Sequence, residues 1–467
     1  MNPLLYDLEL HQQVFQSDSH PDFATRRLRI ERLLTMLNEN EENLCKAIYA
    51  DFGYREPTET KIADILSIRQ EAKFILKNLS SWMKPIKVKT PLHLFPSKSY
   101  LMPQAKGVVG IMSPWNYPLN LALIPTLSAF AAGNRVWLKP SERSPRTSGY
   151  LASLVQQYFH PSELHVVNGG PQVAEHFASL PFAHLFFTGS TATGKLVAKA
   201  AADHLTPTTL ELGGKSPLII DTSASLKDCA QRILYGKLFN AGQTCIAPDY
   251  VLVPEGLQNP LIEALQTAYQ QMYPKASGIT HAIDDDQAFR WHSMISQAVQ
   301  SGAQAVYLGG HTPTLAAPQA TLILNVTSDM LVMTQEIFGP ILPIVTYHDT
   351  QEAIDFINSQ PKPLAAYWFG NHPGRLKQFL DLTCAGGVTV NDTLLHFANH
   401  FLPFGGVGPS GMGAYHGKFG FDTFTHFKPV FEKKSAFGLK ALSGSCPLHP
   451  PYDHQTQRLI KVLEKFS

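Results

Sequence analysis

The chain has 467 residues, of which 44% are hydrophobic and 16% are charged, with 38 Lys and Arg against 37 Asp and Glu. This length exceeds what one hydrophobic core usually supports, and the balanced charge excludes a strongly basic protein, so we expect neither a nucleic-acid nor a membrane partner. The five cysteines form no CxxC pair, which argues against a disulfide framework or a zinc site and predicts a cytoplasmic protein without a bound metal.

The first part of the chain predicts helices followed by an extended arm. The N-terminus has no basic segment ahead of an apolar run, so we expect no secretory signal. Apolar residues at helical spacing predict one amphipathic helix over residues 22–50 and a second over residues 59–83. The stretch from Pro85 to Pro103 is too rich in proline for a helix or a central strand. It predicts an extended arm or edge hairpin that docks on another subunit.

Strands and helices alternate from Gly107 onward. Short apolar runs precede helix-length segments: GVVGIM, RVWLK, LHVVN and HLFFTG before Glu211, then PLIID, YVLV, AVYLGG, LPIVTY, AAYWFG and GVTVN. This alternation predicts right-handed βαβ units in parallel sheets, with two α/β halves that meet near residues 211–214. Because Pro125 interrupts the apolar stretch Tyr117–Leu138, we expect a buried helix and a strand there rather than a membrane span.

Two segments at strand ends are candidates for nucleotide contacts. The turn from Gly189 to Lys195 opens a helix after HLFFT, and backbone N–H groups at such a helix N-terminus attract a pyrophosphate. The turn also matches GxxxxGK, but Leu196 replaces the hydroxyl that would hold magnesium, so a P-loop NTPase is disfavoured. In WLKPSE, Lys139 and Glu142 are placed to bind ribose hydroxyls. A plain tight turn and a solvated charge pair are the structural alternatives.

Four short motifs offer chemically reactive or hydrogen-bonding groups. Cys245 ends FNAGQTC, although a single cysteine in such a chain is more often an inert buried residue. Asn116 in SPWNYP offers a neutral amide donor, and Glu211 in ELGGKSP offers a carboxylate beside two glycines. QEIFGP adds Glu336 and Phe338. Each motif alone is also compatible with a turn or an exposed loop.

Taken together, the motifs resemble the aldehyde dehydrogenase family. SPWNYP, KPSE, FTGSTATGK, ELGGKSP, GQTC, QEIFGP and LPFGGVGPSGMG occur in the order and approximate spacing typical of that family, from Ser113 to Gly413. So many ordered matches leave little room for coincidence. The short N-terminal region and the phrase TCIAPDYVLV are most similar to the class 3 branch, and within it to bacterial coniferyl-aldehyde-type dehydrogenases.

The resemblance implies an α/β fold with a Rossmann-like cofactor domain, an α/β catalytic domain and a small oligomerisation element. We place the cofactor-binding domain at residues 1–84 and 106–212, and the catalytic domain at residues 213–420. The oligomerisation element then comprises residues 85–105 and 421–440. A homodimer is expected, since class 3 members are typically dimeric.

The resemblance also assigns roles to the catalytic candidates. Cys245 attacks the aldehyde as a thiolate and carries first a thiohemiacetal and then a thioester. The Asn116 amide and the Cys245 N–H stabilise the oxyanion, and Glu211, with a pKa above the ordinary glutamate value, activates the hydrolytic water. The implied reaction is NAD(P)-dependent oxidation of an aromatic or medium-chain aliphatic aldehyde to the carboxylic acid.

The cofactor contacts implied by the same resemblance are Ser113, Trp115, Lys139, Ser141, Glu142, Gly189, Ser190, Thr191, Gly194, Glu336 and Phe338. Among these, Glu336 is expected to hold the nicotinamide ribose, and Phe338 is expected to pack near the ring. A carboxylate at Glu142 repels a 2′-phosphate, so NAD is favoured. The class 3 likeness keeps NADP open.

Other interpretations stay open beside this one. A catalytically silent member would serve as a binding or structural protein, and a CoA-acylating enzyme would transfer the acyl group to CoA. His396 and His400 have helical i, i+4 spacing but lack the Glu of an HExxH zinc site, so packing or hydrogen bonding is favoured over a metal. The run GGVGPSGMG is expected to form a turn near the substrate entrance rather than a phosphate site.

Overall fold

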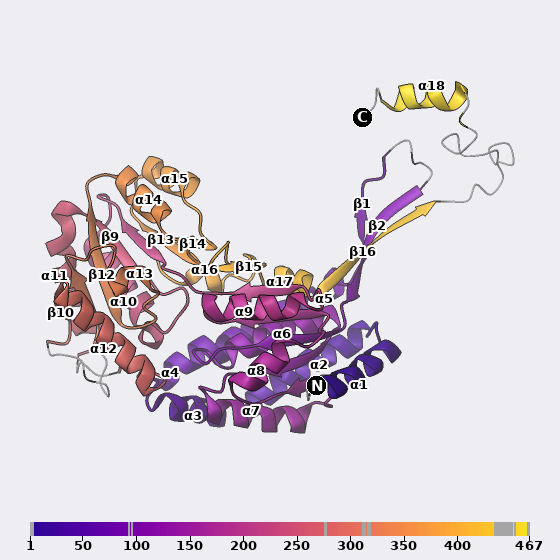
Figure 1. Ribbon diagram of the computed structural model, residues 1–467, viewed down its shortest axis with the longest axis horizontal. Coiled ribbons are helices and arrows are strands. Elements are labelled where there is room, and N and C mark those ends of the chain that lie inside the picture. Colours follow the sequence, from indigo (N-terminus) through magenta and orange to yellow (C-terminus); the bar gives the residue numbers. More distant parts are fainter. Residues whose placement is uncertain are drawn as a thin grey trace. The chain divides into compact units, whose positions relative to one another are not determined.

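The computed structural model describes residues 4–91, 94, 97–274, 278–310, 314, 319–433, 452 and 454–464. The chain forms two compact units, and Figure 1 labels their elements. The first unit comprises Met1–Trp82 and Ala105–Thr425, and the second comprises Met83–Gln104 and His426–Ser467. Both parallel sheets belong to the first unit, so its division into a cofactor-binding and a catalytic domain stays a prediction.

The N-terminal helices are more interrupted than the sequence predicts. Their bounds are α1 (Leu5–Ser17), α2 (Phe23–Glu39), α3 (Glu41–Phe52), α4 (Pro57–Thr60), the π-helix η1 (Lys61–Leu66) and α5 (Ser67–Trp82). The single helix expected over residues 22–50 is wrong, because the chain forms two helices there, α2 and α3, which are separated by Asn40. Its side-chain amide donates to Met36 O at 2.9 Å and competes with the backbone for that carbonyl. The helix expected over residues 59–83 is present but contains the π-helical turn.

The first parallel sheet has the strand order β15-β7-β6-β3-β4-β5. Its strands are β3 (Val108–Met112), β4 (Arg135–Lys139), β5 (Leu164–Val166), β6 (His184–Thr188), β7 (Thr208–Glu211) and the short antiparallel β15 (Gly411–Met412). The helices of this part are α6 (Asn120–Ala132), α7 (Pro145–Tyr158), α8 (Pro171–Ala178) and α9 (Thr191–Ala202). Every residue of α6 is buried, which confirms the expected buried helix before a strand. In the described part of the chain, no helix combines the length and apolar character needed to cross a membrane.

The second sheet has the order β10-β11-β12-β9-β8-β13-β14. Its strands are β8 (Pro217–Ile220), β9 (Tyr250–Pro254), β10 (Gln304–Tyr307), β11 (Thr321–Leu324), β12 (Ile341–Tyr347), β13 (Ala365–Phe369) and β14 (Gly387–Val390). The helices after β8 are α10 (Leu226–Leu238), η3 (Phe239–Gly242), η4 (Glu255–Leu257), α11 (Gln258–Met272), α12 (Asp285–Gln300), α13 (Leu331–Thr334), α14 (Thr350–Ser359), α15 (Pro373–Leu382), α16 (Leu395–Ala398) and α17 (Gly417–Thr423). β10 is antiparallel to β11, and the other pairs are parallel.

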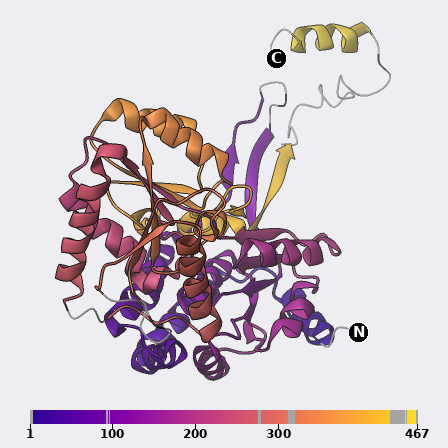
Figure 2. The same cartoon turned by 60° about the vertical axis from the view of Figure 1, so that its left-hand side comes forward.

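The predicted alternation is therefore confirmed, and the chain passes from one sheet to the other between Glu211 and Pro217, as expected for two halves that meet near residues 211–214. Figure 2 shows the pink-to-orange elements of the second sheet above the indigo and purple N-terminal helices. The sequence pattern missed β7 and β11, although β8 and β14, which also have four residues, were predicted.

The second unit contains a three-stranded sheet with the order β1-β2-β16. Its elements are β1 (Ile86–Val88), β2 (Ser97–Ala105), β16 (Thr425–Lys433) and the helix α18 (His454–Leu463). β1 and β2 pair antiparallel, which confirms the predicted extended arm or hairpin where the structure describes it. The bounds of the predicted oligomerisation element differ, since residues 421–425 belong to the first unit and residues 434–440 lie outside the described residues. Its role in oligomerisation stays a prediction.

Candidate active site

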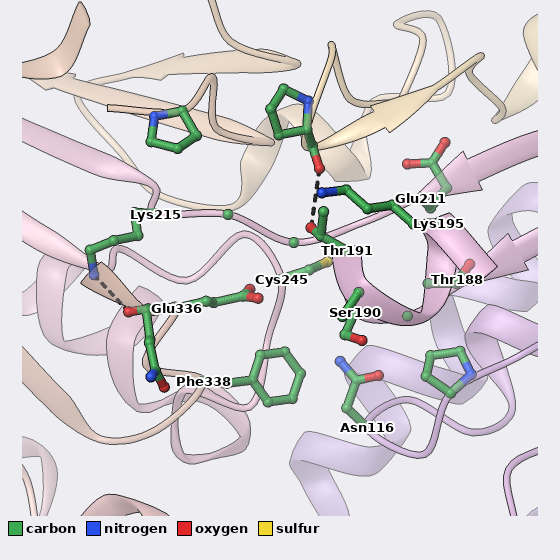
Figure 3. Close-up of a pocket in the computed structure, with 18 of the residues that line it drawn as sticks. Asn116, Thr188, Ser190, Thr191, Lys195, Glu211, Lys215, Cys245, Glu336 and Phe338 are labelled. Carbon is green, nitrogen blue, oxygen red and sulfur yellow. Dashed lines mark hydrogen bonds between the residues drawn. The ribbon is translucent and has the colours of Figure 1, made fainter. Parts of the chain in front are cut away.

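A cavity of about 870 Å³ lies where the strands of the first sheet end. The segments that follow β3, β6 and β7 contribute to its wall, together with the loop after α13. Ligands of open parallel sheets bind at this carboxyl edge. The wall includes many of the residues predicted from the sequence, namely Trp115, Asn116, Gly189, Ser190, Thr191, Glu211, Cys245, Glu336 and Phe338. Figure 3 labels all of these except Trp115 and Gly189.

The turn that carries Cys245 has a strained backbone. Asn240 and Ala241 both have φ of 53°, and Gly242 has φ of 73°, so three successive residues are left-handed. A Cβ atom on Gly242 would lie 2.4 Å from Gly339 O, so only glycine fits there. The turn therefore aims the chain at the cavity just before the cysteine.

The Cys245 thiol is partly exposed to the cavity. Burial raises the pKa of this thiol, and the nearby carboxylates of Glu336 and Glu211 raise it further. The backbone N–H groups of Cys245 and Ile246 act in the opposite direction, because they stabilise the thiolate. In Figure 3 the sulfur lies between Glu336 on one side and Ser190 and Glu211 on the other.

Asn116 presents a buried amide beside the nucleophile's loop. The residue is 3% exposed, and its Nδ2 donates to Gln243 O at 3.0 Å. A side-chain amide carries two N–H groups, so the second can serve a ligand in the cavity. The hydrogen bond to Gln243 ties this donor to the segment that leads into Cys245.

Glu211 ends β7 next to Thr188 of β6. The residue is 2% exposed, and both its side-chain oxygens lack a hydrogen-bond partner among the described residues. Burial raises the pKa of this carboxyl well above its ordinary value. A carboxyl with a raised pKa in a cavity is suited to general base chemistry near neutral pH.

The loop after α13 brings Glu336 and Phe338 to the opposite wall. A Cβ atom on Gly213 would lie 2.1 Å from Glu336 Oε2, so the missing side chain makes room for this carboxylate. Burial, followed by the charge of Asp249, raises the pKa of Glu336 to about 8. The Phe338 ring meets the Trp115 ring edge-on at 5.4 Å between centroids.

The N-terminus of α9 is built to receive an anion. Ser190 is its N-cap and accepts from the Thr193 N–H at 3.2 Å. A Cβ atom on Gly194 would lie 2.5 Å from Leu212 Cδ2, so glycine lets the helix pack closely on the chain after β7. The Lys195 side chain lines the same cavity. A helix N-terminus with an adjacent cation fits the pyrophosphate of a dinucleotide.

The structure does not bring every predicted cofactor residue to the cavity wall. Ser113 follows β3, Lys139 ends β4, and Ser141 and Glu142 come after it. These four residues and Gly194 of α9 are absent from the described lining. The Lys139 ammonium donates to Pro140 O and to Glu142 Oε2, both at 3.1 Å. The charge pair exists, and the predicted contact with a ribose stays a prediction.

Sequence reasoning missed two arginines in this wall. The Arg143 guanidinium lies 4.9 Å from the centroid of the Trp115 ring and forms a bidentate pair with Asp284. Arg290 donates to the carbonyls of Glu336 and Ile337, the latter at 2.7 Å. Arg143 directly follows WLKPSE, and this position is the signal that could have identified it. Arg290 sits in an ordinary helical pattern and carried no such signal.

A second, smaller cavity of about 290 Å³ adjoins Cys245 from another side. Its wall is mostly apolar and aromatic, and Glu211 is the one charged residue among the described lining. The residues shared by both cavities are Leu121, Thr188, Glu211 and Cys245. Charged side chains such as Arg143, Lys195 and Glu336 line the larger cavity, which we therefore call the polar cavity, and the smaller one is called the apolar cavity. The cysteine and the carboxyl thus stand between the two.

His396 and His400, the two histidines with i, i+4 spacing, each contact another side chain of the protein. His396 Nδ1 lies 2.8 Å from Thr389 Oγ1, and His400 Nδ1 lies 2.6 Å from Glu71 Oε2. Both contacts agree with the hydrogen-bonding role expected for them. Among the described residues, no group of three or more potential metal ligands is found.

Comparisons with known proteins agree with this geometry. The family described as "Aldehyde dehydrogenase family" matches residues 11–430. The chain is 43% identical to "Coniferyl aldehyde dehydrogenase" of Pseudomonas sp. strain HR199, covering 94% of this chain and 91% of that one. It is 42% identical to "Probable coniferyl aldehyde dehydrogenase" of Pseudomonas aeruginosa, covering 95% and 92%. The solved "Substrate bound state of Staphylococcus Aureus AldH" is 37% identical with a TM-score of 0.93, covering 99% of this chain and 100% of that one.

Proposed function

Because the chain belongs to the aldehyde dehydrogenase family, it oxidises an aldehyde to the carboxylic acid with a nicotinamide cofactor, and we propose that Cys245 is its nucleophile. Glu211 is the proposed base and Asn116 the proposed oxyanion donor. The observation that carries this proposal is that Cys245 and Glu211 line both cavities at once. An aldehyde entering from the apolar side meets the sulfur, and the cofactor approaches from the polar side.

The residues of the chain act on the carbonyl in two stages. The Cys245 thiol first loses its proton to water, and the thiolate then forms the C–S bond. The oxyanion that results accepts hydrogen bonds from the Asn116 amide and the Cys245 N–H. A bound nicotinamide cofactor would supply the acceptor for the hydride that leaves the carbonyl carbon. Glu211 then takes a proton from water as the water attacks the thioester. The Cys245 thiolate is the leaving group, and the carboxylic acid is released.

The donor set of the polar cavity supports a dinucleotide. The N-terminus of α9 with Ser190 and Lys195 would hold the pyrophosphate, and Glu336 would hold the nicotinamide ribose. NAD is the preferred cofactor in this proposal, because Glu142 repels a 2′-phosphate. Its ion pair with Lys139 weakens that repulsion, so NADP is expected as a slower alternative.

The apolar cavity supports an uncharged aromatic or medium-chain aliphatic aldehyde as substrate. Its aromatic wall offers contact area to a ring or an alkyl chain. An aldehyde that carries a carboxylate would lose its hydration in this apolar cavity without a lysine or arginine in the described lining to pair with it, so succinate semialdehyde is expected to be a poor substrate.

The decisive experiment follows NADH or NADPH absorbance with benzaldehyde, coniferaldehyde, hexanal and octanal. Cys245→Ala is expected to abolish turnover, whereas the matched variant Cys384→Ala, at an exposed cysteine outside both cavities, is expected to retain it. Product analysis with and without CoA separates hydrolysis from acyl transfer. Turnover that survives in Cys245→Ala would remove the proposed nucleophile, and an intact protein without turnover would favour a silent member.

A further inference from the structure

A buried arginine lies directly behind the segment that carries Asn116. Arg55 is 0% exposed, and its Nη1 donates to Asn116 O at 3.2 Å. Its guanidinium also lies 5.0 Å from the centroid of the Tyr117 ring. A fully buried charge is costly unless it has partners, so its partners indicate what the arginine does.

Two carboxylates face the guanidinium. Its Nη2 lies 3.3 Å from Asp64 Oδ2, and its Nε lies 3.6 Å from Glu59 Oε1. Asp64 Oδ1 in turn accepts from the N–H groups of Leu119 and Asn120, at 3.2 and 2.9 Å. These N–H groups stand at the start of α6, just after Asn116. The ion pair therefore fixes the point at which the oxyanion donor's loop enters its helix.

Glu59 extends the network to the nucleophile's loop. Its Oε1 accepts from the Asn240 N–H at 2.7 Å. The Asn240 side chain donates to Asn116 O at 2.9 Å and to Gln243 O at 3.2 Å. Gln243 O is also the acceptor that orients the Asn116 amide. One buried guanidinium and its two carboxylates thus connect the loop of the donor with the loop of Cys245.

We propose that Arg55, with Glu59 and Asp64, is a positioning residue that holds Asn116 in register with the Cys245 N–H. This inference rests on the oxyanion role of Asn116 given above. Such donors lower the barrier only if they are in place before the charge develops, and a misplacement of about 1 Å costs about 10²-fold in rate. Lysine at this position keeps the charge but lacks the planar guanidinium, whose Nη1 donates to Asn116 O while Nη2 and Nε face the two carboxylates.

A double-mutant cycle tests the proposal. Arg55→Lys is expected to lower kcat by about 10- to 100-fold, with a much smaller change in the KM for the aldehyde. In the Asn116→Ala background the same substitution is expected to change kcat no further, because the donor that it positions is gone. Losses that add fully in the double variant, or a loss confined to KM, would overturn the positioning role.

The rate at which iodoacetamide alkylates Cys245 separates the proposed role from a general structural defect, because such a defect would change this rate as well. This reaction displaces iodide from a saturated carbon and develops no carbonyl oxyanion. Arg55→Lys is therefore expected to leave the alkylation rate unchanged, and a fall in parallel with kcat would overturn the proposal. The matched control is Arg29→Lys, at an arginine 3% exposed and paired with Glu163 at 3.0 Å, which is expected to leave kcat unchanged.

If circular dichroism shows that Arg55→Lys does not fold, a second variant tests the same proposal. Asp64→Asn keeps an oxygen for the N–H groups at the start of α6 but removes the charge that faces the guanidinium, and it enters the same cycle under the same criteria. The two proposals fail in different ways. Asn116→Ala with normal kcat would remove the donor itself, whereas a large loss in Asn116→Ala beside normal kcat in Arg55→Lys overturns the positioning role alone.

Discussion

At the scale of single residues, the active site keeps groups that work against stability. Glu211 is buried, and neither side-chain oxygen has a partner among the described residues. Desolvation of such a carboxylate destabilises the folded chain, and a core of ordinary design would pair or replace it. The same desolvation raises its pKa and makes it a stronger proton acceptor once it is ionised.

Replacing Glu211 is expected to separate the two halves of the reaction. Glutamine cannot take a proton from water, so Glu211→Gln is expected to accumulate the thioester on Cys245. NADH should then appear as a burst stoichiometric with enzyme, followed by a steady rate about 10²–10⁴-fold below that of the native enzyme. Stopped-flow absorbance measures both phases. The absence of a burst would indicate that Glu211 acts at or before hydride transfer. An unchanged steady rate would exclude Glu211 as the base that activates water.

The raised pKa of Glu211 also gives the pH dependence its sign. A base acts in its deprotonated form, and burial shifts that form to higher pH. With hydrolysis limiting, kcat is expected to rise as pH rises through the raised pKa and to level off above it. Glu211→Gln is expected to lose this rising limb. A native kcat that falls over the same range would contradict the assignment.

At the scale of elements, α9 connects fold and function through its first turn. Ser190 satisfies one of the free N–H groups at that end, and Ser190, Thr191 and Lys195 line the cavity. Gly194 permits the close packing that holds the helix there, because a side chain at this position would collide with Leu212. The helix dipole then favours an anion at the cavity.

Removing this cap is expected to weaken cofactor binding as well as the helix. Ser190→Ala is expected to cost about 1 kcal/mol of folding stability and to raise the KM for NAD by about 5-fold. The matched control is Asp349→Ala, which removes the cap of α14 outside both cavities. Thermal unfolding should show a similar loss of stability for both variants. The KM for NAD should change in Ser190→Ala alone. Equal KM values for NAD in the two variants would contradict a role of α9 in cofactor binding.

At the scale of the whole molecule, the sheet of the second unit suggests how chains associate. Its order leaves β1 and β16 at the edges, and edge strands are templates for pairing with another chain. Ile86, Val88 and Phe431 on these strands are 41%, 42% and 50% exposed. Exposed apolar side chains on an open edge favour the predicted homodimer, and both the dimer and the cytoplasmic location stay predictions.

Charged residues on these edges are expected to separate the subunits. The double variant Ile86→Glu, Phe431→Glu is expected to halve the mass measured by light scattering after size-exclusion chromatography, because two carboxylates would then face the partner's edge. Phe289→Glu, at a phenylalanine of the first unit that is 56% exposed, is the control and is expected to keep the native mass. An intact chain that already has the mass of a monomer would contradict the predicted dimer.

Local sequence patterns predicted much of the fold and of the candidate site. Periodic apolar residues predicted the alternating strands and helices, and their failure at Asn40 came from a side chain that competes with the backbone. The motifs around Cys245, Glu211 and Asn116 identified the reaction because each is a short segment at the end of an element. A pattern of this kind survives in the sequence without knowledge of its neighbours.

The sequence by itself determined the family, the two α/β halves and the order of the chemical groups, since these depend on segments of a few residues. The tertiary structure alone decided which groups lose their water and which meet. Arg55 contacts Asn116 across 61 positions, and Arg143 meets Asp284 across 141. Such pairs leave no local period or motif. Their energies depend on burial, and burial exists only once both sheets and their helices have packed.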